Sequence, residues 1–106
     1  KAAVDWIRKH YGLESNPGMG SAGLYYYYHT FAKALDALGQ GRLVDENGEV
    51  HDWRADLIAT LAERQRSDGS WVNDQNERWL EGDPNLVTAY SLLALSYCED
   101  VFEHAP

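Results

Sequence analysis

The chain has 106 residues, nine of them basic and seventeen acidic, so its net charge is −8. This charge argues against nucleic-acid binding, because neutralising phosphates needs a basic patch, and against attachment to anionic membranes. The length suits one domain, no apolar run approaches the roughly 18 residues of a membrane-spanning helix, and the single cysteine, Cys98, excludes an internal disulfide.

The spacing of apolar residues predicts four helices, over residues 2–11, 22–38, 52–66 and 85–102. The second is the clearest, because apolar side chains recur between Leu24 and Leu38 at steps of four and three. Asn47 and Gly48 predict a short hairpin or tight loop near residues 43–50. The fourth helix is apolar on nearly every side, and such helices are surrounded by protein, so we expect it to be an inner helix of a larger helical assembly.

A helix, a long loop and an apolar helix occur twice in the chain. The stretch that begins at Thr30 aligns with the stretch that begins at Thr88, 58 residues later. We therefore expect an all-α fold of two tandem αα-hairpins in one domain over residues 1–106, with repeat one over about 2–38 and repeat two over about 52–102. Two unrelated amphipathic hairpins with similar leucine and alanine spacing are the alternative.

One motif stands out in the second repeat. It reads L-x-x-x-Q-x-x-x-G-x-W and consists of Leu61, Gln65, Gly69 and Trp71. Gln65 near a helix end can satisfy free backbone groups with its side-chain amide. Gly69 supplies a turn because it tolerates positive φ. We expect Trp71 to fold back onto the helix end, where its indole N–H needs a partner if it is buried.

This motif resembles the glutamine–tryptophan repeat of the squalene and oxidosqualene cyclases and of the related protein prenyltransferase β-subunits. The resemblance is strongest over residues 61–95, whereas Thr60 stands where the family usually has an aromatic residue and the first repeat lacks the glutamine and the tryptophan. It implies an α/α-toroid of which this chain is a part, with a parent protein that acts on a polyprenyl substrate. In that family the motif ties helices together and is not catalytic.

The catalytic signatures of that family are missing from the sequence. It contains no D-x-D-D acid motif and no D-D-x-x-D motif for magnesium diphosphate, and no Asp lies two residues before Cys98 to form a zinc site. Residues 45–49 faintly resemble a calcium loop but lack its final Glu, so a simple turn is favoured. His29 and His51 have no partners at ligand spacing. We therefore predict no metal site and no cofactor.

Candidate cavity residues come from two segments. Residues 25–28 are four consecutive tyrosines at the start of the second helix, so some rings either line a hydrophobic cavity or pack against a neighbouring repeat, and packing is favoured. Trp79, Glu81 and Asp83 precede the fourth helix, where an acid beside aromatic rings can bind a ligand, although Asp83 is also an ordinary helix-start residue. The candidate cavity or ligand residues are Tyr25, Tyr28, His29, Trp79, Asp83 and Tyr90.

These observations leave three functions open. The first is a repeat segment of a squalene-cyclase- or prenyltransferase-like protein, with a hydrophobic isoprenoid as the ligand. The second is a non-catalytic helical-repeat module that builds an interface. The third is a carbohydrate-active α/α-toroid, suggested by the acidic residues and tryptophans. The expected partners are the remaining repeats of the parent chain or a second copy of this chain.

Overall fold

The computed structural model describes residues 2–39, 41–76 and 78–98. Its elements in chain order are α1 (Ala2–Lys9), α2 (Leu24–Ala37), β1 (Leu43–Val44), β2 (Val50–His51), α3 (Trp53–Arg64), the short 3-10 helix η1 (Arg78–Leu80) and α4 (Pro84–Ser96). This part of the chain is mostly helical with one small sheet, so the four predicted helices are confirmed. α4 ends earlier than predicted, and the last predicted residues of that helix, 99–102, lie outside the described residues.

The helix ends follow local chemistry that the sequence displays. Asp52 precedes α3 and its carboxylate accepts a hydrogen bond from the Ala55 N–H at 3.2 Å. Asp83 does the same for α4 by accepting from the Asn85 N–H at 2.9 Å. Gly39 follows α2 with φ 69, the left-handed conformation that commonly ends a helix.

The predicted hairpin near residues 43–50 is also confirmed. β1 and β2 pair antiparallel, with Leu43 opposite His51. The turn closes when the Gly48 N–H donates to the Asp45 carbonyl at 3.0 Å, with Gly48 at φ 85. The hairpin therefore connects α2 to α3 and carries the side chains of residues 45–51.

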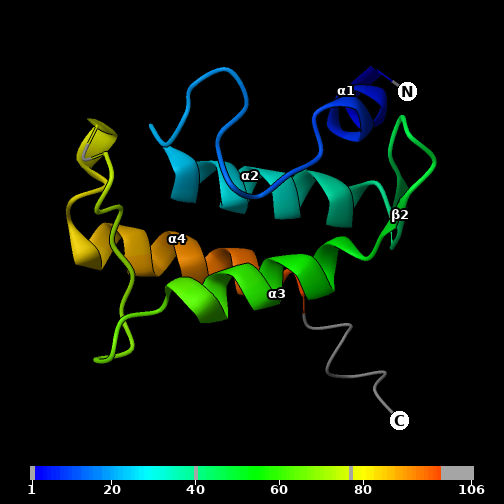
Figure 1. Ribbon diagram of the computed structural model, residues 1–106. Coiled ribbons are helices and arrows are strands. Elements are labelled where there is room, and N and C mark those ends of the chain that lie inside the picture. The colour runs from blue at the N-terminus through cyan, green and yellow to red at the C-terminus, as the bar shows by residue number, and fades with distance from the viewer. Residues whose placement is uncertain (1, 40, 77, 99–106) are drawn as a thin grey trace, which may run out of the picture.

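α2 and α4 pack side by side and run in the same direction, whereas α3 runs in the opposite direction (Figure 1). The core is made of apolar side chains from these helices. Its fully buried members include Tyr28, Leu35, Trp53, Leu57, Leu61 and Val87. Arg54 of α3 ties the same helices together at one end, because its guanidinium donates to the Asp36 carboxylate at 2.9 Å and to the Tyr97 carbonyl at 3.2 Å.

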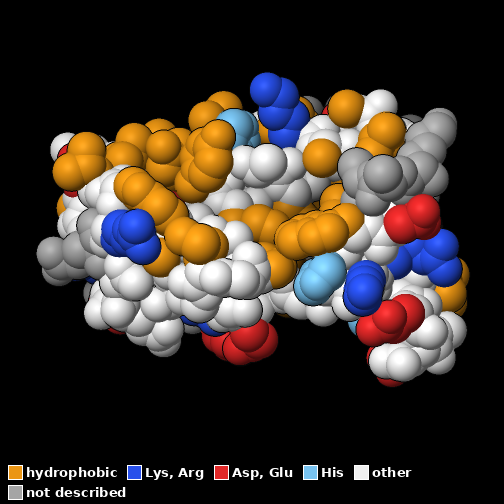
Figure 2. All heavy atoms as spheres, turned by 90° about the horizontal axis from the view of Figure 1, so that it is seen from above, with side chains coloured by type: hydrophobic (Ala, Val, Ile, Leu, Met, Phe, Trp, Pro, Cys, Tyr) orange, Lys and Arg blue, Asp and Glu red, His pale blue; other side chains and the backbone are white. Residues whose placement is uncertain are grey.

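One side of α4 is not covered by the described part of the chain. Leu92 is 56% exposed and Leu93 is 46% exposed, although the apolar sequence of this helix predicts burial all round. The reason is that α2 and α3 approach α4 from one side. Broad hydrophobic patches also lie on the face seen from above in Figure 2. The described helices are each too short or too polar to cross a membrane.

Candidate functional site

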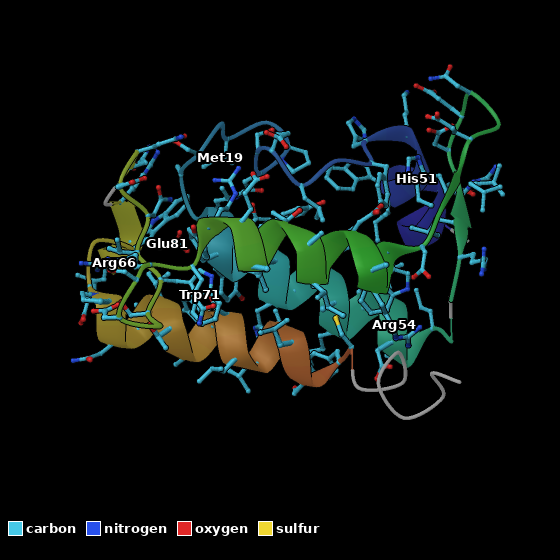
Figure 3. The ribbon with its side chains drawn as sticks, turned by 60° about the horizontal axis from the view of Figure 1, so that its bottom comes forward. Met19, His51, Arg54, Arg66, Trp71 and Glu81 are labelled. Carbon is cyan, nitrogen blue, oxygen red and sulfur yellow. The ribbon has the colours of Figure 1, made fainter. Side chains whose placement is uncertain are left out.

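Trp71 joins the end of α3 to α4. Its ring is buried, and its indole N–H donates to the Leu61 carbonyl in the last turn of α3 at 2.8 Å. Its backbone N–H donates to the Thr88 hydroxyl of α4 at 3.0 Å. Figure 3 shows Trp71 between the two helices. The fold-back that the sequence predicts for this tryptophan is therefore present, and it satisfies a carbonyl that a helix end leaves free.

Gln65 and Gly69 form the turn that brings Trp71 back. The side-chain amide of Gln65 donates to the Gly69 carbonyl at 3.0 Å, and Gly69 has φ 89, which a residue with a Cβ rarely adopts. Gln65 is exposed, so water can replace its hydrogen bond. The amide therefore closes the loop, whereas the position of Gln65 near a helix end predicts a hydrogen bond to the carbonyls of that end.

An aromatic pocket of about 410 Å³ lies at the starts of α2 and α4. Its lining residues are Asn16, Tyr26, Trp79, Glu81 and Tyr90. The rings of Tyr26 and Tyr90 meet edge to face, with centroids 5.5 Å apart. Trp79 of this lining is 53% exposed. Aromatic walls of this kind bind apolar ligands and attract cations.

Glu81 is the acidic residue of the aromatic pocket, and its side chain is fully buried. One carboxylate oxygen accepts from the Tyr25 N–H at 3.0 Å and from the Asn73 side-chain amide at 3.1 Å, and the other accepts from the Tyr26 N–H at 2.8 Å. Gly23, the residue before α2, has no side chain to cap the helix, so Glu81 satisfies its first free donors. Figure 3 shows Glu81 beside the first turn of α2.

The backbone at Trp79 and Leu80 is strained. Their φ angles are 58° and 66°, a region that costs a bulky residue about 1–3 kcal/mol. Close packing holds Trp79 there: a Cβ on Gly23 would lie 2.7 Å from the indole ring. Glu81, the residue after Leu80, is also fixed in place, because its backbone carbonyl accepts a hydrogen bond from the Asn73 N–H at 2.8 Å. Strain held by surrounding contacts is common at binding sites.

The predicted cavity residues are divided among several places. Trp79 and Tyr90 line the aromatic pocket, and Asp83 caps α4. Tyr28 is buried in the core, where its hydroxyl donates to the Leu13 carbonyl. Tyr25 is buried beside it, with ring centroids 5.3 Å apart, and lines a second, more polar hollow.

Three of the predicted cavity residues, Tyr25, Tyr28 and His29, lie on α2, and their side chains stay uncharged at neutral pH. Burial raises the pKa of Tyr25 and of Tyr28, so both phenols keep their protons. Burial, followed by the charge of Lys33, lowers the pKa of His29, whose ring stacks 6.2 Å from the ring of Tyr90. These groups therefore offer neutral aromatic surface.

Three pocket residues are absent from the predicted set. Tyr26 belongs to the tyrosine run, but which of the four rings faces the pocket depends on the position of α4. Glu81 stands between Trp79 and Asp83 in the sequence, an acid beside aromatic residues, but only the structure places its side chain in the pocket lining. Asn16 lies in the loop before α2, and no sequence pattern identifies it.

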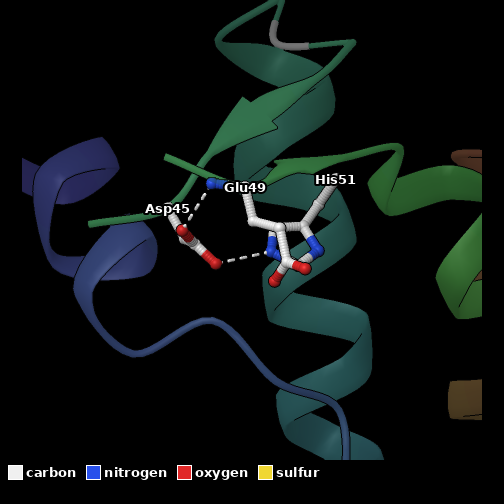
Figure 4. A group of neighbouring side chains, drawn as sticks. All are labelled: Asp45, Glu49 and His51. Atoms are coloured by element: carbon white, nitrogen blue, oxygen red, sulfur yellow. Dashed lines mark hydrogen bonds and ion pairs between the residues drawn. The ribbon is translucent and has the colours of Figure 1, made fainter. Parts of the chain in front are cut away.

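A second group of polar side chains gathers on the β1–β2 hairpin. Atoms of Asp45, Glu49 and His51 that can bind a metal lie within 4.8 Å of one another (Figure 4). A hydrogen bond from His51, followed by one from the Glu49 N–H, lowers the pKa of Asp45, so its carboxylate is charged. The sequence pattern favours a simple turn at residues 45–49 and gives His51 no partner, but the hairpin register brings Asp45, Glu49 and His51 together.

The chain matches no protein-family model, no curated protein and no solved structure. What the protein does must therefore be inferred from its own residues and contacts.

Proposed function

We propose that the chain is a pair of αα-repeats from an α/α-toroid of the squalene-cyclase and prenyltransferase type, and that the parent acts on a polyprenyl substrate. The observation that carries this proposal is the parallel packing of α2 and α4 (Figure 1). Each of these helices follows a shorter helix and a long loop. Tandem helical repeats stack in this way, with equivalent helices side by side.

Contacts between the two repeats support this proposal. The loop before α4 belongs to the second repeat, yet Glu81 caps α2 of the first repeat. In the same loop, the side-chain amide of Asn73 donates to the Ser21 carbonyl at 2.6 Å. The first repeat therefore depends on the second for these polar contacts, as expected for units that build a continuous core.

The exposed side of α4 supports a further repeat or a second copy beside it. Leu92 and Leu93 lie on this side, and an exposed apolar face of a helix marks an interaction surface. The same observation favours the second candidate function, a repeat module that builds an interface without catalysis. The two functions differ in whether the aromatic pocket binds an isoprenoid.

We expect the isolated chain to self-associate through α4. The sedimentation coefficient is expected to rise with concentration for the wild-type chain and to stay at the monomer value for the Leu92→Glu/Leu93→Glu variant. The matched control is Val50→Glu, which adds a charge at another exposed apolar residue and is expected to associate like the wild type. A wild-type monomer at every concentration, with well-protected α4 amides in hydrogen exchange, would contradict the proposed role of this helix.

We expect the aromatic pocket to bind an isoprenoid alcohol. Equilibrium dialysis with labelled geranylgeraniol is expected to give tighter binding than with unbranched hexadecanol, and Trp79→Leu is expected to weaken it about fivefold or more by removing a large aromatic surface. Trp6→Leu is the matched control, because Trp6 is 46% exposed and lines a separate apolar hollow of about 230 Å³. If both alcohols bind equally, or if both variants lose the same affinity for geranylgeraniol, the non-catalytic interface module is the better function. If the chain binds oligosaccharides instead, the carbohydrate-active α/α-toroid is favoured.

A further inference from the structure

The hairpin cluster lies at the opposite end of the molecule from Glu81 and the aromatic pocket (Figure 3). It combines one imidazole, from His51, with two carboxylates, from Asp45 and Glu49. The antiparallel register places Asp45 and Glu49 opposite each other at the base of the turn, next to His51 of β2. The cluster is thus separate from everything that the proposed function uses.

The imidazole of His51 is held from outside the hairpin. It stacks on the ring of Tyr11, with centroids 3.9 Å apart and an angle of 21° between the planes. The Tyr11 hydroxyl donates to the Asp56 carboxylate of α3, and that carboxylate lies 3.8 Å from Nδ1 of His51. A histidine that binds a metal through one ring nitrogen usually donates its other N–H to a carboxylate, and Asp56 lies on that side of the ring, beyond direct hydrogen-bond distance.

The remaining ring nitrogen points toward the carboxylates. Nε2 of His51 lies 2.8 Å from Oδ2 of Asp45. The other oxygen of Asp45, Oδ1, already accepts hydrogen bonds from the N–H groups of Asn47 and Glu49, both at 2.9 Å. Oδ2 is therefore the oxygen that can bind a metal ion. Ligand atoms on a tetrahedral zinc ion stand about 3.3 Å apart, given bonds of about 2.0–2.1 Å. The Glu49 carboxylate lies within 4.8 Å of the other two ligand atoms. Because this side chain is exposed, it can rotate to bring its oxygen to the spacing that zinc requires.

We propose that Asp45, Glu49 and His51 bind a divalent transition-metal ion, with zinc as the best fit. The imidazole selects zinc, cobalt or nickel over magnesium and calcium, which prefer oxygen ligands only. The two carboxylates balance the charge of the ion. Three protein ligands leave at least one coordination position for water, and Tyr11 and Asp56 keep the imidazole oriented.

Isothermal titration of the chelator-treated chain with zinc chloride tests this site. We expect one zinc ion per chain, with affinity reduced about tenfold or more by Glu49→Gln and further by His51→Ala. His10→Ala is the matched control, because His10 is an exposed histidine outside the cluster, and it is expected to bind like the wild type. Magnesium and calcium are expected to bind far more weakly.

Two further measurements test the site even if one variant fails to fold. Glu49→Gln changes an exposed side chain and is expected to fold normally, so its loss of affinity counts even if His51→Ala unfolds the hairpin. In the wild type, zinc is expected to shift the Nε2 resonance of His51 in a nitrogen NMR spectrum. The site is overturned if zinc does not bind, if both variants bind it unchanged, or if calcium binds equally well.

Discussion

Replacing Trp71 by alanine is expected to lower the free energy of unfolding by about 3–5 kcal/mol, the usual range for a buried tryptophan. The ring is 3% exposed and fills the space between α3 and α4. Its removal leaves a cavity and leaves the Leu61 carbonyl without its indole donor, whereas the backbone N–H of residue 71 still donates to the Thr88 hydroxyl. Urea denaturation followed by circular dichroism measures the loss.

Two companion variants separate packing from hydrogen bonding at this motif. Trp71→Phe keeps most of the ring but removes the indole donor, and we expect a loss of about 1–3 kcal/mol from the unsatisfied carbonyl. Gln65→Ala removes an exposed hydrogen bond and is expected to lose only about 0.5–1 kcal/mol. A loss for Gln65→Ala as large as that for Trp71→Ala would show that the turn, rather than the buried ring, holds the motif together.

Replacing Glu81 by alanine is expected to lower the free energy of unfolding by about 2–4 kcal/mol. The carboxylate accepts three hydrogen bonds in a fully buried position, and its loss leaves the Tyr25 and Tyr26 N–H groups without an acceptor. The Glu81 side chain also lines the aromatic pocket, so binding there is expected to weaken together with stability. Faster hydrogen exchange at the Tyr25 and Tyr26 amides is the specific signature.

Two control variants show how much of the stability loss in Glu81→Ala comes from the buried carboxylate. Glu63→Ala removes an exposed glutamate from α3 and is expected to change stability by less than about 0.5 kcal/mol. Glu81→Gln keeps the shape of the side chain but retains one acceptor oxygen and introduces an amide donor, so an intermediate loss is expected. If Glu81→Ala is as mild as Glu63→Ala, with unchanged exchange at the start of α2, then this carboxylate does not hold the helix.

Several elements could be predicted from the sequence because their causes are local. The apolar spacing from Leu24 to Leu38 sets which side of α2 faces the core. Asp52 caps the helix that follows it, and Asn47 with Gly48 makes the turn between two short strands. The return of Trp71 to Leu61 is also short-range, because ten residues separate them. Each of these needs only neighbouring residues and backbone geometry.

The candidate sites could be predicted only in part: the sequence indicates Trp79 and Tyr90 as cavity residues, whereas the other members depend on contacts between distant segments. Glu81 is one of many acidic residues in the sequence, and only the packing of its loop on α2, 55 and 56 residues away, makes it a helix cap. His51 looks isolated until Tyr11 stacks on it from 40 residues away.

The sequence by itself thus determined the helices, their caps and the hairpin turn, since hydrogen bonds and apolar spacing within a few residues decide them. The tertiary structure alone decided which polar side chains meet, and that α4 leaves Leu92 and Leu93 uncovered. The physical reason is that burial depends on which elements pack together. Apolar spacing indicates which side chains favour burial but does not indicate which segment covers them.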